Sequence, residues 1–407
     1  MKKEIKPNRT SEKLELSKVK LDSLLKITIG INENLSTDEL LSLFLSILYQ
    51  DLKIGKICLF VKREKWELKL KQGVSEEILA FDWQKVEEEV KGIKVISSGD
   101  ETFLHPFDVI IPIQHKNHPI AFLLLGDFDG EKLEVSPIIK HLHYIQTLSN
   151  IIVVAFENKR LYQDSLKKAA LQKELDVARD MQRLLIPNRL IGNQFYQFNS
   201  LYLPYEEVGG DYFDVIPLDN DKVAFCIADV SGKGVSAALL MANFQANLRA
   251  LINVASSLEE LIVRLNQKVI DSGGREKFIT FFVGIFDPIS RTLTSINAGH
   301  NPPLLYHNNQ ILELTKGCTI LGMFDELPEI LVDTHQLQSG DKILCYTDGI
   351  TEITNYEGVE MGVGPLINVL RSSTIEKLAD DLKNKADQFR GASPLPDDIT
   401  LLAALFK

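Results

Sequence analysis

Two aspartates in the middle of the chain have the type and spacing to hold a metal ion. Asp211 precedes the apolar run 212–217, and Asp229 closes a second apolar run. The turn-like segment 218–222 between the runs predicts a β-hairpin. If its turn centres on Asn220, Asp211 and Asp229 lie equally far from the centre, so their carboxylates oppose each other at about 4.5–5.5 Å. Opposed like charges are destabilising, and a hard divalent cation is the simplest compensation; the alternative is that one aspartate only forms a turn or a cap.

Two further aspartates lie at the ends of predicted strands. Asp348 follows the strand-like segment 341–347, and Asp397 stands just before the last apolar run, 399–406. Strand ends commonly carry functional side chains because loops there are supported by a rigid sheet. Four such carboxylates with few basic neighbours favour magnesium or manganese over zinc, because hard cations prefer oxygen ligands. We refer to Asp211, Asp229, Asp348 and Asp397 as the acidic quartet.

Five motifs place these aspartates in a recognisable order. They read GGDYFD, ADVSGKG, NAGHNPPLL, YTDGITE and PDDIT along the chain. This ordered set resembles the metal-dependent protein serine/threonine phosphatases of the PPM, or type 2C, superfamily, and within it the bacterial SpoIIE/RsbU branch. The resemblance covers residues 171–407. It implies an α-β-β-α sandwich, in which two stacked and mainly antiparallel sheets are covered by helices on both outer faces.

The resemblance also assigns roles to particular residues. It implies two Mn²⁺ or Mg²⁺ ions that neutralise the phosphoryl oxygens and activate a bridging water. Asp211 and Asp229 correspond to the pair that bridges the two metals, and the carbonyl of Val230 to an additional ligand. Asp348 and Asp397 each complete the shell of one metal. The four aspartates are therefore the predicted catalytic residues, and no covalent protein nucleophile is expected.

Other positions near the motifs keep two interpretations each. His300 stands where many type 2C enzymes have an aspartate that supports a third metal, so a third metal is not expected here. The histidine is either a proton donor to the leaving group or a structural loop residue. Asp398 either orients a metal-bound water or caps the following strand. Lys233 is either a cation at the rim of the site or a turn residue. Four glycines are expected to let the backbone pass close to the site: Gly209, Gly210, Gly232 and Gly234.

The implied function is hydrolysis of phosphoserine or phosphothreonine on a signalling partner. The family resemblance points to a STAS-type anti-sigma-factor antagonist as that substrate. One alternative is a non-catalytic signalling adaptor whose phosphatase site has decayed, and another is a phosphatase for a small phosphorylated metabolite. A decayed site would have lost at least one member of the acidic quartet, and all four are present.

Composition restricts the remaining possibilities. At 407 residues the chain exceeds the usual size of a single core, and 45% of its residues are hydrophobic, so several well-packed domains are expected. The net charge of −11 argues against nucleic-acid binding. No signal peptide and no uninterrupted apolar run of about 18 residues is visible, and four cysteines without close spacing indicate reduced thiols. We therefore expect a cytoplasmic protein that contacts no membrane.

The N-terminal part of the chain predicts a sensory domain. Residues 1–20 are expected to form a flexible tail, and residues 21–156 an α+β domain. Helices are predicted at 21–35 and 37–52, the second with a capping box of Ser36 and Glu39. Predicted strands at 57–62, 66–70, 108–113 and 121–126 and a last helix from about 135 to 155 complete a pattern that resembles a GAF domain, with a PAS-like fold as the rival. Its signal would be a small molecule or a protein.

A helical linker at 157–186 connects this domain to the phosphatase domain, residues 187–407. The linker has no Gly or Pro before Pro187, where the helix is expected to end. An apolar stripe with heptad-like spacing runs along it, interrupted by Gln182: Leu171, Leu175, Ala178 and Leu185. The stripe predicts either a helix that lies on its own domain or a parallel stalk that joins a homodimer and transmits a signal.

Overall fold

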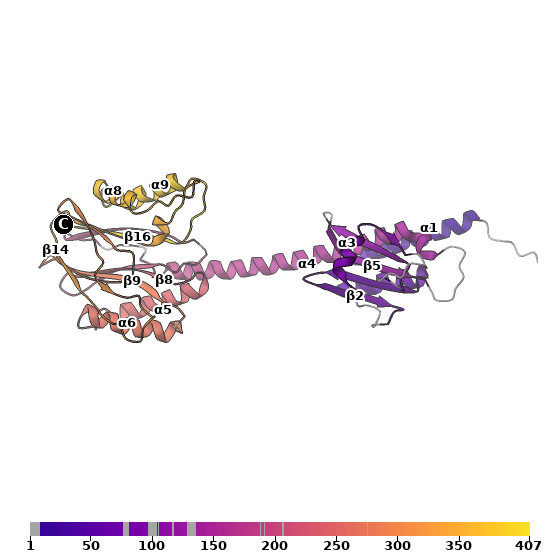
Figure 1. Cartoon of the computed structure of the whole chain (residues 1–407), viewed down its shortest axis with the longest axis horizontal. Helices are drawn as coiled ribbons and strands as arrows, with labels where there is room; N and C mark the ends of the chain where they lie inside the picture. The colour runs from indigo at the N-terminus through magenta and orange to yellow at the C-terminus, as the bar shows by residue number, and fades with distance from the viewer. Residues whose placement is uncertain are drawn as a thin grey trace, which may run out of the picture. The chain divides into compact units, whose positions relative to one another are not determined.

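The chain divides into two compact units in the computed structural model. The structure describes residues 9–75, 81–96, 104, 106–115, 118–127, 136–187, 189–190, 192–205, 207–274 and 276–407. The units are Met1–Ala169 and Ala170–Lys407, so the division falls inside the segment that we predicted as a linker (Figure 1). Within the described ranges, no helix combines the length and the apolar character that a bilayer crossing requires.

The first unit is built on an antiparallel sheet with strand order β2-β1-β5-β4-β3. The four predicted strands are confirmed, with ends that differ by a few residues. The strands are β1 (Lys56–Lys62), β2 (Trp66–Gln72), β3 (Lys94–Val95), β4 (Val109–His115) and β5 (His118–Gly126). The helices are α1 (Arg9–Asn32), α2 (Thr37–Ser46), the π-helical turn η1 (Ile47–Asp51), α3 (Trp83–Glu89) and α4 (Pro137–Arg183).

Alternating side chains give this sheet two buried faces. Along β1, Ile57 and Leu59 pack into the cluster formed with α1, α2 and α4, whereas Cys58 and Phe60 pack on the opposite face. On that opposite face aromatic rings stack on one another, with Trp66 and Trp83 4.8 Å apart. These tryptophans therefore fill a core. The order of elements is the one from which we predicted a GAF-like domain, and the family of this unit stays a prediction.

The N-terminal helices confirm one local prediction and correct another. The capping box at the start of α2 is present, because Ser36 and Glu39 exchange both hydrogen bonds. The predicted tail is wrong for residues 9–20, which are the beginning of α1, while residues 1–8 lie outside the described residues. This stretch carries no Gly or Pro, so nothing in it interrupts the helix that continues to Asn32.

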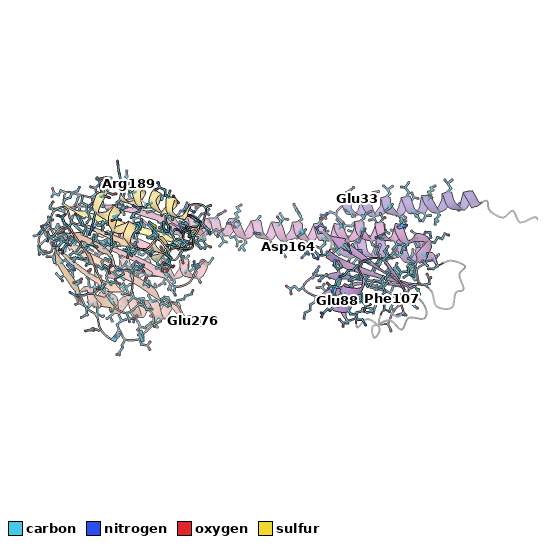
Figure 2. All side chains as sticks on the ribbon, turned by 45° about the horizontal axis from the view of Figure 1, so that its top comes forward. Glu33, Glu88, Phe107, Asp164, Arg189 and Glu276 are labelled. Atoms are coloured by element: carbon cyan, nitrogen blue, oxygen red, sulfur yellow. The ribbon has the colours of Figure 1, made fainter. Side chains whose placement is uncertain are left out.

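Helix α4 is a single helix where two were predicted. It runs from Pro137 to Arg183, so the last helix of the sensory domain and the linker are continuous, and the helix stops three residues before the predicted end at 186. The predicted start near 135 lies outside the described residues. Residues 161–174 are all exposed, as the side chains around Asp164 illustrate (Figure 2). A continuous helix without Gly or Pro after its first residue, Pro137, can act as a stiff connection.

The second unit contains two stacked sheets. One has the order β13-β10-β9-β8-β7 with β14 added beside β10, and the other has the order β12-β11-β15-β16-β6. The first sheet comprises β7 (Tyr212–Pro217), β8 (Val223–Val230), β9 (Ile279–Asp287), β10 (Thr292–Ala298), β13 (Gly317–Cys318) and β14 (Asp333–Gln336). The second comprises β6 (Tyr196–Leu203), β11 (Leu304–His307), β12 (Gln310–Glu313), β15 (Lys342–Tyr346) and β16 (Ile399–Phe406).

Three separate cores hold this unit together and confirm the predicted α-β-β-α sandwich. The central core lies between the sheets and is rich in phenylalanine, including Phe225, Phe282 and Phe406. An outer core joins the first sheet to α5 (Val235–Leu251) and α6 (Leu258–Gly273). The other outer core joins the second sheet to α7 (Asp348–Thr351), α8 (Gly364–Ser372) and α9 (Leu378–Arg390). Figure 1 shows these helix pairs on opposite sides of the sheets.

Candidate functional site

The β7–β8 hairpin directs two aspartates toward the space between the sheets. The predicted register is confirmed, because Tyr212 pairs with Ala228 and Phe213 with Ile227. Phe213 and Ile227 belong to the core between the sheets. Side chains alternate along a strand, so Asp229, two residues after Ile227, points to the same face. Asp211 lies one residue before β7 starts, where the same alternation would continue.

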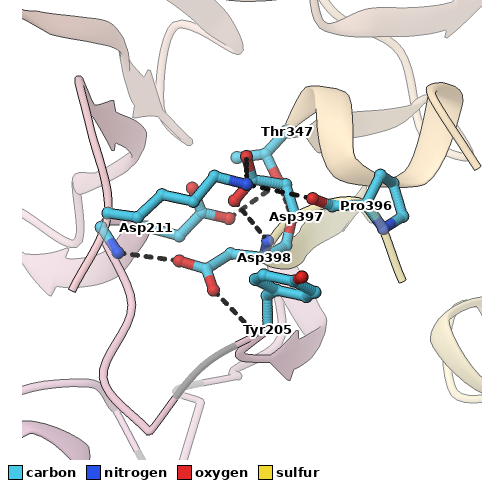
Figure 3. Close-up of polar contacts among 8 residues, drawn as sticks. Tyr205, Asp211, Thr347, Pro396, Asp397 and Asp398 are labelled. Carbon is cyan, nitrogen blue, oxygen red and sulfur yellow. Dashed lines mark hydrogen bonds and ion pairs between the residues drawn. The ribbon is translucent and has the colours of Figure 1, made fainter. Parts of the chain in front are cut away.

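Hydroxyl groups from the second sheet anchor Asp211. Its Oδ2 atom accepts a hydrogen bond from Thr347 Oγ1 at 2.8 Å (Figure 3). It also accepts one from Thr400 Oγ1 at 2.6 Å. Thr347 follows β15 and Thr400 lies in β16, so these contacts tie the two sheets together at the site. Sequence analysis missed both threonines. Their positions beside Asp348 and Asp398 were the available signal.

Asp398 holds the loop that leads into the hairpin. Its carboxylate accepts the backbone N–H of Tyr205 and of Gly210, each at 2.7 Å (Figure 3). Both partners belong to the segment before the hairpin and not to the strand that follows Asp398, so these contacts do not support the predicted strand cap. A side chain at Gly209 would collide with the Asp398 carboxylate and the Tyr202 hydroxyl, which explains the close backbone passage expected there.

Burial and neighbouring carboxylates raise the pKa values of Asp211, Asp229 and Asp348. Burial, followed by the charges of Asp348 and Asp397, raises the pKa of Asp229 to about 7. Burial and the charge of Asp229 raise the pKa of Asp211 well above its usual range. Burial and the charge of Asp397 also raise the pKa of Asp348. The structure therefore brings the four predicted aspartates within electrostatic reach of one another, at a real cost in charge repulsion.

A small pocket opens beside these carboxylates. Its volume is about 90 Å³, and its lining includes Asp229, Val230, Lys233 and Asp397. Lys233 lies at its rim, where Nζ pairs with Asp397 Oδ2 at 2.8 Å and donates to the carbonyl of Pro396 at 3.0 Å (Figure 3). Of the two interpretations of Lys233, the geometry favours the rim cation. Gly232 and Gly234 on either side have positive φ angles.

The donor set fits hard divalent cations. All the side-chain candidates are carboxylates, which is the chemistry that Mg²⁺ and Mn²⁺ prefer. Among the described residues, no three His, Cys, Asp or Glu side chains are already drawn together in the manner of a metal cluster. Asp397 is instead paired with Lys233. For Asp397 to bind a cation, its ion pair with Lys233 would have to break.

Comparison with known proteins agrees with this geometry. The family model SpoIIE, described as stage II sporulation protein E, matches residues 219–407. The C-terminal half of this chain is a SpoIIE/RsbU-like PPM phosphatase domain. The matched range contains Asp229, Asp348 and Asp397, whereas Asp211 lies just before it.

Individual relatives of the SpoIIE-type domain are distant. Phosphoserine phosphatase RsbU of Bacillus subtilis is 26% identical over 190 residues, which cover 46% of this chain and 56% of RsbU. Protein IcfG of Synechocystis sp. is 26% identical over 285 residues, 63% of this chain and 45% of IcfG. The solved SiaA-PP2C domain of Pseudomonas aeruginosa shares the fold, with a TM-score of 0.52 and 19% identity over 59% of this chain and 99% of that domain. The chain thus spans about half the length of these two curated relatives.

His300 of the SpoIIE-type domain lies behind the hairpin. Its Nδ1 atom is 2.8 Å from Thr280 Oγ1, and Thr280 pairs with Asp229 across β8 and β9. Its loop is closed by Asn297, which accepts from the backbone N–H of His300 and donates to its carbonyl. Burial lowers the pKa of His300 to about 4, so the ring is neutral near pH 7. These contacts favour the structural interpretation over a cationic proton donor.

Gln182 connects helix α4 to the SpoIIE-type site. The side-chain amide donates to the carbonyl of Gly209 at 2.7 Å and accepts its N–H at 3.1 Å. Gln182 is buried, although sequence analysis saw it only as an interruption of the apolar stripe. The buried amide shares its face of the helix with the half-buried Leu175 and Ala178, whereas Leu171 of the predicted stripe is exposed. One face of α4 therefore reaches the residues just before Asp211.

We expect Mn²⁺ to raise the melting temperature of the full-length protein. The pKa of Asp229 rises from 3.8 to about 7 on folding, so its protonated form is favoured in the fold. The protonated Asp229 carboxyl therefore stabilises the fold fully at pH values below its unfolded-state pKa of 3.8. This stabilisation is lost as the pH rises through about 7. Metal-free protein should therefore lose stability across this window, and stabilisation by Mn²⁺ should increase with pH.

Scanning calorimetry at several pH values, with and without Mn²⁺, measures this effect. The double variant Asp211→Asn, Asp229→Asn should lose both the response to Mn²⁺ and most of the pH dependence. Asp219→Asn with Asp221→Asn, at the exposed tip of the same hairpin, is the matched control and should behave as the parent. If Mn²⁺ does not change the melting temperature of the parent protein at any pH, the expectation is contradicted.

Proposed function

We propose that this chain is a metal-dependent protein serine/threonine phosphatase. The observation that carries the proposal is that Asp229 and Asp397 line one pocket of the SpoIIE-type domain, while Asp211 and Asp348 lie within electrostatic reach of them. A non-catalytic adaptor would have no reason to keep four carboxylates within electrostatic reach of one another. The adaptor alternative is therefore less well supported.

Different residues of the site would hold the cations and the substrate. Asp211 and Asp229 would bridge two Mn²⁺ or Mg²⁺ ions, with Asp348 and Asp397 each completing one shell and the Val230 carbonyl assisting. When bound, these ions supply the positive charge and the activated water that hydrolysis of a phosphomonoester needs. Both threonine hydroxyls bond Oδ2 of Asp211, so Oδ1 is the atom left to meet a cation.

Lys233 and Asp398 support this arrangement in different ways. Lys233 places an ammonium group at the rim of the pocket, where the phosphate dianion of a substrate would enter. Asp398 fixes the loop 205–210 through two backbone bonds and so positions Asp211. Fixed donors and charges of this kind accelerate a reaction because they need no rearrangement as it proceeds.

The proposed substrate is a phosphoserine or phosphothreonine on a signalling protein. The relatives RsbU and RsbP are named phosphoserine phosphatases, which supports a phosphoserine ester. The sequence resemblance to the SpoIIE/RsbU branch adds a STAS-type anti-sigma-factor antagonist as the specific partner. A pocket of about 90 Å³ matches a single phosphorylated side chain better than a large metabolite.

We further propose that the GAF-like first unit regulates this activity through α4 in a homodimer. Exposed apolar side chains on α4 support a helical partner, because large apolar groups are rarely left in water over several turns: Leu161, Tyr162, Leu166 and Leu171. Gln182 at the other end of the helix bonds the loop before Asp211. A signal that moves α4 would therefore reach the site directly.

Phosphate release by the full-length protein tests the proposed function. With Mn²⁺ present, the protein should release phosphate from a phosphoserine peptide and hydrolyse p-nitrophenyl phosphate. Excess EDTA should abolish both activities, and added Mn²⁺ should restore them, because the carboxylates alone cannot stabilise the dianion. Turnover that persists in EDTA excludes the metal mechanism, and absence of turnover with Mn²⁺ favours the adaptor.

A further inference from the structure

A second depression in the SpoIIE-type unit carries no role in the mechanism above. It has a volume of about 530 Å³ and lies between the end of α4, β6, α7 and α9. We call it the basic groove, because four of its lining residues are cations: Arg179, Arg183, Lys383 and Arg390. Its only acidic lining residue among those described is Asp387. This concentration of positive charge stands out in a chain whose net charge is −11.

Two of the four cations are available to a partner. Arg179 pairs with Asp176 at 2.8 Å, and Arg390 pairs with Asp387 at 2.8 Å. Arg183 and Lys383 form neither a hydrogen bond nor an ion pair with any residue in the described ranges. Lone surface cations are usually just solvated. Here Arg183 of α4 and Lys383 of α9 line the same depression although they come from separate elements, which differs from a charged face on one helix.

Apolar side chains also line the basic groove. They include Leu203 of β6 and Ile399 of β16, together with Ile350 of α7 and Leu395. A lining that combines cations with apolar side chains suits a chain segment that carries both acidic and apolar residues. A free inorganic anion would use only the cations.

The groove adjoins the acidic quartet along the chain. Ile399 follows Asp398 directly, and Ile350 lies two residues after Asp348. Pro204, also in the lining, precedes Tyr205, whose N–H bonds Asp398 and whose side chain lines the pocket at the quartet. Neighbouring residues in an extended chain are about 3.3 Å apart, so the linings of the two depressions adjoin at Pro204–Tyr205 and at Asp398–Ile399. A protein substrate with its phosphoserine in the small pocket could therefore extend into the groove.

We propose that the basic groove docks an acidic, apolar-containing segment of the phosphoprotein substrate, next to the phosphorylated residue. The inference rests on the proposed phosphatase function and names the partner of the same site. Arg183 can hold a carboxylate through two parallel N–H bonds, and Lys383 attracts acidic side chains as a point charge. Such charges mainly raise the association rate and select among partners. The quartet performs hydrolysis, and the groove selects which phosphoprotein is hydrolysed.

Two synthetic phosphoserine peptides test the docking with the full-length protein. One carries Glu and Leu residues beside the phosphoserine, and the other carries Gln in place of each Glu. The parent should prefer the acidic peptide in kcat/KM by about tenfold, mainly through KM, and salt should reduce the preference. Lys383→Glu and, separately, Arg183→Glu should remove the preference, while kcat/KM for p-nitrophenyl phosphate stays at the parent value.

Lys385→Glu is the matched control. Lys385 lies on the same helix, α9, is exposed and is absent from the groove lining, so its reversal changes net charge equally without changing the groove. Equal kcat/KM for both peptides in the parent, or equal effects of Lys385→Glu and Lys383→Glu, would overturn the docking. Those outcomes leave p-nitrophenyl phosphate hydrolysis intact. Failure of the proposed function itself is distinct, because the parent would then hydrolyse neither peptide nor p-nitrophenyl phosphate.

Discussion

Asp229→Asn is expected to lower kcat/KM for a phosphoserine peptide by about a thousandfold or more, which corresponds to roughly 4 kcal/mol of lost transition-state stabilisation. Asp229 is the proposed ligand shared by both cations, and its carboxylate interacts with Asp348, Asp397 and Asp398. The amide of Asn keeps the size of the side chain but removes the negative charge. The variant should therefore fold, but it should bind cations and turn over substrate less well than the parent protein.

Steady-state assays in Mn²⁺, with p-nitrophenyl phosphate in parallel, measure this loss. Asp219→Asn provides the control, because Asp219 lies in the turn of the same hairpin and is exposed. The control should retain parental kcat/KM. In the absence of metal, Asp229→Asn should be at least as stable as the parent, since it removes a carboxylate whose ionisation is disfavoured in the fold. Parental turnover by Asp229→Asn would exclude Asp229 as a shared ligand.

Gln182→Ala is expected to reduce kcat/KM by about tenfold to a hundredfold, although residue 182 lies outside the small pocket. The substitution removes both hydrogen bonds to Gly209 and leaves a buried N–H and a buried carbonyl without partners. Such a loss costs about 1–3 kcal/mol, and each 1.4 kcal/mol is tenfold in an equilibrium constant. Gly209 is two residues from Asp211, so a loosened loop also loosens a proposed metal ligand.

The Mn²⁺ concentration for half-maximal activity separates this coupling from general destabilisation. Gln182→Ala should require more Mn²⁺ than the parent and should respond less to removal of the first unit. Met181→Ala is the matched control, because Met181 precedes Gln182 on α4 and its side chain is 66% exposed. Unchanged Mn²⁺ dependence in Gln182→Ala, with a lowered melting temperature, would mean that the contact only stabilises the fold.

Local patterns in the sequence determined much of the fold and the identity of the quartet. The hairpin register followed from its turn, because strand residues alternate and a turn fixes which residues oppose each other. The capping box at Ser36 and Glu39 followed from a spacing of three residues. The aspartates were visible because each closes or opens an apolar run. These features depend on neighbours in the chain, and so the sequence alone could specify them.

Tertiary structure decided which groups surround those aspartates. Thr347 and Thr400 reach Asp211 from the other sheet, and the Gln182 amide reaches Gly209 from a helix 27 residues away along the chain. Whether residues 137–183 form one helix or two was also undecided by pattern, because both halves are helical and the junction carries no breaking residue. The basic groove exists only because residues of α4, α9 and β6 line the same depression. Contacts of this kind follow from how sheets and helices stack, and no local periodicity encodes which partner a given side chain will meet.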